Sequence, residues 1–174
     1  MRGVNFQVPA GRQAGMITHD PSAPSSERGT VLIVDDNPRN LQLLAEMLSD
    51  GGYTVRPASS GRRALRSAQA EPPDIVLLDI NMPEMDGYAV CRQLKADPAN
   101  RDLPVIFISA LDEVADKVRA FAEGGVDYIT KPFRIEEVQA RIEAHLTIRR
   151  MRRTLEAQNE RLHILARFPD ENPN

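Results

Sequence analysis

Short apolar runs alternate with helical patterns five times along the chain, and this alternation restricts the fold more than any other feature. The runs are residues 30–35, 53–58, 74–78, 103–109 and 126–130. The first is almost continuously apolar, as expected of a strand that is covered on both faces. The intervening stretches have apolar residues at helical spacing. Five such units predict an α/β domain with a doubly wound parallel sheet.

In sheets of this kind, ligands bind beyond the carboxyl ends of the strands, so the residues at those ends are the candidate site residues. Three acids, a hydroxyl and a lysine follow four different strands: Asp35, Asp36, Asp79, Ser109 and Lys131. Each has an ordinary explanation when taken alone. An Asp before a helix is often a cap, and a Lys after a strand is usually solvated. The fold, however, brings all five to one rim.

The chemistry of these five side chains fits a single purpose. Three carboxylates packed together repel one another unless a cation binds between them, and hard oxygen ligands favour Mg²⁺. The remaining lysine and hydroxyl suit the oxygens of a phosphoryl group. The carboxylate of Asp79 could then attack phosphorus and form an aspartyl phosphate.

Residues from about 30 to 146 resemble the receiver domain of a two-component response regulator. The resemblance rests on VDD at 34–36, LLDINMPEMDG at 77–87, ISA at 108–110 and YITKPF at 128–133. It implies a flavodoxin-like sheet of order 2-1-3-4-5. It also implies that the phosphoryl group comes from a histidine kinase or a phosphotransfer protein.

The resemblance assigns roles to individual residues. Asp79 would be the phosphoacceptor. Mg²⁺ would be held by three carboxylates, one of them often through water, and by one backbone carbonyl: Asp35, Asp36, Asp79 and Asn81. The phosphoryl group would be contacted by Ser109, the N–H of Ala110 and Lys131. Ser109 and Tyr128 would form the switch, and the bond between Lys131 and Pro132 would be cis. Asp86 and Gly87 are interpreted as the start of a helix.

Two other functions compete with this one. A Mg²⁺-dependent phosphatase of similar topology also uses an aspartyl nucleophile, but it typically places a second acid two positions later, where this chain has Asn81. A receiver that serves only as a scaffold would lack an acid or the lysine, and none is missing. We therefore expect a signalling domain that catalyses only its own phosphorylation and dephosphorylation.

The segments on either side have different character. Residues 1–29 lack apolar periodicity and are predicted to be disordered. A final helix should run from Ile135 to about residue 167. Residues 147–167 are predicted to form a coiled-coil linker and a parallel homodimer, because apolar residues repeat at spacings of three and four. This seam consists of Ile148, Met151, Leu155, Gln158, Leu162 and Leu165. The alternative is a helix packed along its own domain. Four arginines lie off the seam and are interpreted as a solvated face: Arg149, Arg150, Arg152 and Arg153.

The tail and the composition complete the sequence-based expectations. Residues 168–174 resemble the lead into a PAS domain, so we expect an output domain to follow. Residues 30–133 carry 11 basic and 16 acidic side chains, a balance of −5 that argues against nucleic-acid binding. Apolar runs are too short to span a membrane. A single cysteine, Cys91, suits a reducing compartment. These features predict a cytoplasmic protein.

Overall fold

The structure, a computed structural model, describes residues 28–110 and 113–167, with side chains as far as residue 164. Its strands are β1 (Thr30–Val34), β2 (Thr54–Ala58), β3 (Ile75–Asp79), β4 (Val105–Ser109) and β5 (Asp127–Thr130). Its helices are α1 (Pro38–Asp50), α2 (Gly61–Ala70), α3 (Gly87–Ala96), α4 (Val114–Ala122) and α5 (Ile135–Arg167), with a short 3₁₀ turn η1 (Pro98–Asn100). The predicted alternation is confirmed, and η1 was not predicted.

The five strands form one parallel sheet of order β2-β1-β3-β4-β5, which confirms the predicted order. The strand order reverses at β1, because β2 lies on one side of β1 and β3 on the other. Since β1 and β3 are parallel neighbours, their carboxyl ends lie at the same edge of the sheet. A ligand site is expected there, beside the point where the strand order reverses.

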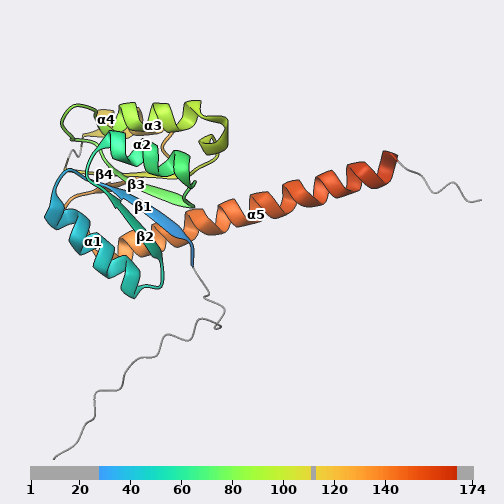
Figure 1. Cartoon of the computed structure of the whole chain (residues 1–174), viewed down its shortest axis with the longest axis horizontal. Helices are drawn as coiled ribbons and strands as arrows, with labels where there is room; N and C mark the ends of the chain where they lie inside the picture. Colours follow the sequence, from blue (N-terminus) through green and yellow to red (C-terminus); the bar gives the residue numbers. More distant parts are fainter. Residues whose placement is uncertain (1–27, 111–112, 168–174) are drawn as a thin grey trace, which may run out of the picture.

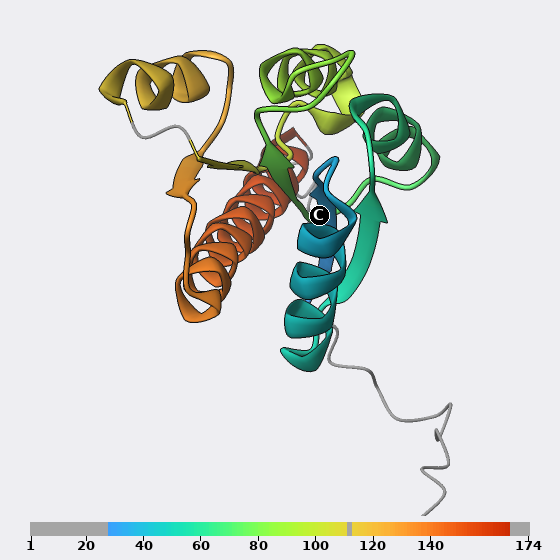
Figure 2. The same ribbon diagram turned by 90° about the vertical axis from the view of Figure 1, so that its left-hand side faces the viewer.

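Helices cover both faces of the sheet (Figure 2). Side chains from alternate strand positions pack with α1 and α5 on one face, as Val31 and Ile33 do in β1. The intervening side chains, such as Leu32 and Val34, pack with α2, α3 and α4 on the other face. Burial on both sides explains why the central strands are apolar throughout.

The amino-terminal edge of the fold begins slightly earlier than predicted. Arg28 donates a backbone hydrogen bond to the carbonyl of Gly52, and the carbonyl of Gly29 accepts one from Thr54. These two residues, which belong to the predicted disordered extension, thus extend the pairing between β1 and β2. The rest of that predicted extension lies outside the described residues. None of the described helices is long and apolar enough to cross a membrane.

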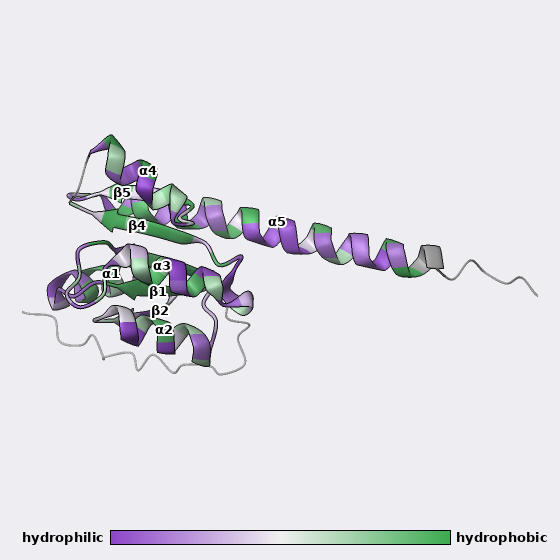
Figure 3. Cartoon of the chain, turned by 90° about the horizontal axis from the view of Figure 1, so that it is seen from above, coloured by the Kyte–Doolittle hydropathy of each residue, from purple (hydrophilic) through white to green (hydrophobic). Residues whose placement is uncertain are grey.

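Helix α5 begins on the sheet and then runs well beyond it (Figure 1). Val138, Ile142 and Leu146 are buried against the sheet. From residue 151 to residue 164 every side chain is exposed. Apolar and polar residues alternate along this projecting part (Figure 3). The exposed apolar residues of α5 include Ile148, Met151, Leu155 and Leu162. The alternative of a helix packed along its own domain is therefore wrong for this part of the chain.

Candidate functional site

Three carboxylates gather where β1 and β3 end. Asp35 directly follows β1, and Asp79 is the last residue of β3. Asp35, Asp36 and Asp79 each offer an oxygen within 4.8 Å of the others. Asp35 and Asp79 are buried, whereas Asp36 is exposed. The two buried carboxylates need partners, because an unpaired charge in the interior is costly.

Lys131, which follows β5, supplies a positive charge to both buried carboxylates. Its Nζ lies 2.9 Å from Oδ2 of Asp35 and 3.3 Å from Oδ1 of Asp79. The lysine is separated from Asp35 by 96 positions in the sequence. The predicted convergence of the strand-end acids with the lysine is thus seen in the fold.

Two asparagines that the sequence analysis did not single out hold Asp35. The backbone N–H of Asn37 donates to Oδ1 of Asp35 over 2.8 Å, and Nδ2 of Asn40 donates to Oδ2 over 2.9 Å. The side chain of Asn37 is also the cap of α1, because it accepts a bond from the N–H of Arg39. The ordinary interpretation of Asp35 and Asp36 as cap residues is therefore wrong. An Asn immediately before a helical Pro is the signal that would have found the true cap.

Gly87 lets the start of α3 approach the end of β3. Its N–H donates to the carbonyl of Ile80 over 2.9 Å. A Cβ at this position would collide with the backbone carbonyl oxygen of Asp79. The side chain of Asp86 caps α3 by accepting a bond from the N–H of Ala89 over 2.7 Å. Asp86 is a helix-start residue as predicted, but Gly87 also sets the position of the Asp79 backbone.

Three of the other predicted site residues lie at the same edge of the sheet, and Tyr128 lies within β5, opposite Phe107 of β4. Ser109 ends β4 and is fully buried, and its carbonyl accepts a 2.7 Å bond from the N–H of Lys131. Ala110 follows it and is exposed, as is Asn81 after β3. Tyr128 in β5 is buried, with 7% of its surface exposed. The peptide bond between Lys131 and Pro132 is cis, as expected.

The electrostatics of the site reflect an excess of negative charge. Burial raises the pKa of Asp79 above its ordinary value; the charge of Lys131 lowers this pKa and the charge of Asp35 raises it. Burial acts to lower the pKa of Lys131, but its hydrogen bonds and the two carboxylate charges raise that pKa overall. Three carboxylates and one ammonium leave a formal charge of −2.

That donor set fits a magnesium ion. Mg²⁺ prefers oxygen ligands and is commonly held by one or two carboxylates together with waters and phosphate oxygens. Here three carboxylates provide oxygens close enough to share one ion, and the excess charge matches a divalent cation. Asp36 is exposed, so the acid cluster is open to solvent on that side.

Comparison with known proteins identifies the family. Residues 31–143 match the family described as the response regulator receiver domain. This match covers well over half of the chain, and the chain therefore belongs to the response regulator receiver family.

Individual relatives support the same assignment. The chain is 39% identical over 116 residues to the DNA-binding dual master transcriptional regulator RpaA of Synechocystis sp., covering 67% of this chain and 48% of RpaA. It is 39% identical over 140 residues to the response regulator PleD of Caulobacter vibrioides, covering 78% of this chain and 31% of PleD. The chain thus spans less than half the length of either relative.

A solved structure agrees with the fold. The signal receiver domain of a signal transduction histidine kinase from Syntrophus aciditrophicus is 38% identical to this chain, with a TM-score of 0.64. The similarity covers 68% of this chain and 90% of that domain.

Proposed function

We propose that this protein is a Mg²⁺-dependent receiver module that accepts a phosphoryl group on Asp79 from a histidine kinase or a phosphotransfer protein. The observation that carries the proposal is the position of the Lys131 ammonium, which contacts both Asp35 and Asp79 at the ends of neighbouring strands. A lysine held this way can neutralise a phosphoryl oxygen as soon as Asp79 is modified.

The remaining residue roles come from the family resemblance and are part of the proposal. An Asp79 oxygen forms the new bond to phosphorus while the bond from phosphorus to the donor nitrogen breaks, and the released imidazole takes a proton from water. The Lys131 ammonium, the Ser109 hydroxyl and the N–H of Ala110 then face the phosphoryl oxygens. Asp35, Asp36, Asp79 and the carbonyl of Asn81 would hold Mg²⁺, which would supply positive charge to offset that of the phosphoryl group.

The phosphatase alternative is weaker. Such an enzyme needs a second acid near the nucleophile to move a proton, and Asn81, at the corresponding position, has no carboxylate. Asp86 is engaged as the cap of α3. A scaffold without phosphorylation is also disfavoured, because the acids and the lysine are all present and in contact.

Mass spectrometry tests the phosphoacceptor directly. Incubation with Mg²⁺ and acetyl phosphate should add one phosphoryl group to the wild-type chain and none to Asp79→Asn. Asp50→Asn, which changes an exposed carboxylate at the far end of α1, is the matched control and should be modified like the wild type. Equal modification of Asp79→Asn and the wild type would refute the assignment.

We further propose that residues 148–165 pair with a second copy in a parallel coiled coil and carry the signal to a downstream output or PAS-like domain. Support comes from the exposed apolar side chains at the seam positions Ile148, Met151, Leu155 and Leu162. The side chain of the sixth seam residue, Leu165, lies outside the described residues. The match to PleD extends over 140 residues, against 116 for RpaA, so it covers more than the receiver.

Light scattering tests this pairing. Leu155→Glu with Leu162→Glu places charges in the seam and should halve the mass. Ala157→Glu with His163→Glu adds the same two acids away from the seam and should leave the mass of the dimer unchanged. An unchanged mass for the seam variant would show that the seam is not the interface.

The remaining expectations concern partners and location. The acidic balance of residues 30–133 offers little to nucleic acid, so we propose that any contact with DNA belongs to a downstream domain. We also propose that the module works in the cytoplasm, where a kinase domain would meet it, without contact to a membrane.

A further inference from the structure

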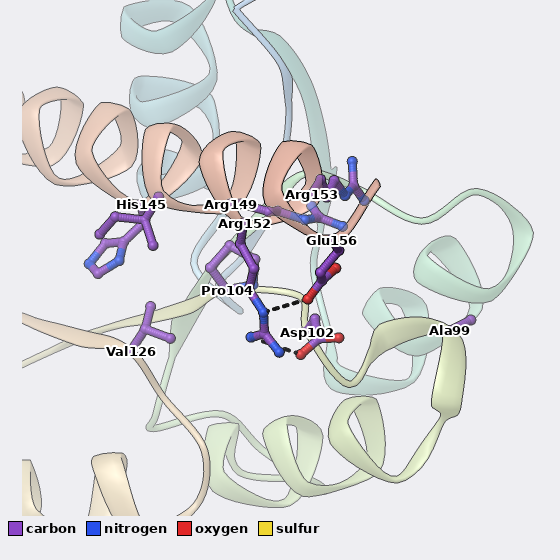
Figure 4. Close-up of a pocket in the computed structure, with 10 residues that line it drawn as sticks. Ala99, Asp102, Pro104, Val126, His145, Arg149, Arg152, Arg153 and Glu156 are labelled. Carbon is purple, nitrogen blue, oxygen red and sulfur yellow. Dashed lines mark hydrogen bonds and ion pairs between the residues drawn. The ribbon is translucent and has the colours of Figure 1, made fainter. Parts of the chain in front are cut away.

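Helix α5 makes polar contacts with the residues before β3 at the point where the helix leaves the domain. Leu146 is its last buried apolar side chain. One turn later the side chain of Arg149 is only 12% exposed, although the sequence analysis placed this arginine on a solvated face. Figure 4 shows Arg149 among the residues that line a cavity of about 250 Å³ beside the helix. Burial of a charged side chain here requires an explanation.

The contacts of Arg149 provide that explanation. Its Nη1 donates to the carbonyl of Pro73 over 3.1 Å and to the carbonyl of Asp74. The same nitrogen lies 3.5 Å from Oδ1 of Asp74. Pro73 and Asp74 directly precede β3. We call these contacts between Arg149, Pro73 and Asp74 the clasp.

Asp74 extends the clasp to a second strand. Its N–H donates to the carbonyl of Thr30 over 2.9 Å, and its Oδ2 accepts a 3.0 Å bond from the N–H of Thr30. The clasp therefore joins α5 to the beginnings of both β1 and β3. These two strands carry Asp35 and Asp79 at their opposite ends, only about 17 Å away for a strand of five residues.

A neighbouring arginine makes a weaker attachment. Arg152 forms a 3.2 Å ion pair with Asp102, drawn in Figure 4, but their side chains are 62% and 65% exposed. Exposed pairs of this kind contribute little. Arg153 lines the same cavity, yet it makes no hydrogen bond or ion pair with the described residues. Arg149 is thus the residue on which the attachment chiefly depends.

We propose that Arg149 is a positioning residue that fixes the direction in which the distal half of α5 leaves the receiver, and that it ties this direction to β1 and β3. The 18 residues beyond it make a lever of about 27 Å. A tilt of about 10° at the clasp would move the end of such a lever by about 5 Å. The direction of distal α5 does not depend on phosphorylation. A signalling role for the clasp, by contrast, rests on the proposed function.

All three contacts converge on one end of the Arg149 side chain. Two backbone carbonyls and a carboxylate surround Nη1 of the guanidinium, whose charge strengthens each bond. Its Nε is buried without a partner among the described residues, so the Nη1 contacts must outweigh that loss. A methionine would keep much of the apolar stem but offer no donor to these acceptors.

Distances between spin labels test the clasp in the full chain. Labels are placed on exposed positions of α1 and distal α5 through Gln42→Cys and Glu160→Cys, while the buried Cys91 stays unlabelled. Labelled protein is mixed with an excess of unlabelled protein, so that each measured distance lies within one chain. No phosphoryl donor or Mg²⁺ is added, so failure of the proposed phosphorylation cannot influence the result.

The wild type and the control Arg153→Ala should give the same narrow distance distribution. Arg149→Ala should give a broader and shifted distribution, with unchanged circular dichroism. If Arg149→Ala does not fold, Arg149→Met takes its place and should also broaden the distribution, because its thioether offers no donor to the three acceptors. A distribution as narrow as that of the wild type in the folded variant would overturn the proposal.

Discussion

Replacing Lys131 by methionine tests the electrostatic reasoning most directly, because it removes the positive charge between two buried carboxylates. Lys131 lies 2.9 Å from Asp35 and 3.3 Å from Asp79. Breaking a buried ion pair by removing one partner costs roughly 3–5 kcal/mol. The lysine side chain is 23% exposed, and water that screens part of its charge lowers the expected loss to about 2–3 kcal/mol.

The loss should depend on pH with a definite sign. Burial and the charge of Asp35 already raise the pKa of Asp79 above its ordinary 3.8, and Lys131 opposes them. Without the lysine this pKa rises further. A carboxyl with a raised folded-state pKa contributes stability below its unfolded pKa, and that contribution disappears as the pH rises through the folded-state pKa. The deficit of the variant should therefore be largest near neutral pH and shrink as the pH falls towards 3.8.

Urea unfolding in the presence of a chelator measures this effect. The midpoint for Lys131→Met should fall by about 1 M urea at neutral pH, with an unchanged slope. Arg39→Met removes a positive charge from an exposed position at the start of α1 and should have little effect. Added Mg²⁺ should stabilise Lys131→Met more than the wild type, because the ion no longer competes with the ammonium. An unchanged midpoint, or a deficit that grows in acid, would refute the reasoning.

Three further predictions address separate parts of the structure. Gly87→Ala should lower the free energy of unfolding by about 1–3 kcal/mol in urea titrations, because the added methyl group collides with backbone; a neutral effect would contradict the close approach. Asp36→Ala should weaken Mg²⁺ binding by roughly tenfold or more in calorimetric titration, since it removes an oxygen ligand and a charge, while leaving the folded structure intact because Asp36 is exposed. Burial raises the pKa of the Cys91 thiol to about 11, so iodoacetamide should react with it only as fast as the domain opens; rapid modification of the folded protein would show that the thiol is accessible.

The sequence by itself determined the fold and the membership of the acid cluster. Strands such as β3 are five residues long and buried throughout, so their apolar runs stand out against the helical spacing around them. In a parallel sheet the carboxyl ends of the strands share one edge, which is why the sequence alone predicts that residues as distant as Asp35 and Lys131 lie together. The apolar seam of α5 was also predicted from the sequence, because it depends only on the spacing of residues along one helix.

Only the tertiary structure decided how other residues are used. The sequence around Gly87 is typical of the start of a helix. The role of Gly87 in allowing α3 to approach Asp79 depends on the backbone of β3, which comes close only in the folded chain. The partner of Arg149 lies 75 positions away, and four arginines within five residues look alike in the sequence. Which of them is buried is decided by the direction that each faces on α5 as the helix passes the edge of the sheet. Local periodicity fixes which face of a helix a residue occupies, but only the packing of distant segments determines what that face meets.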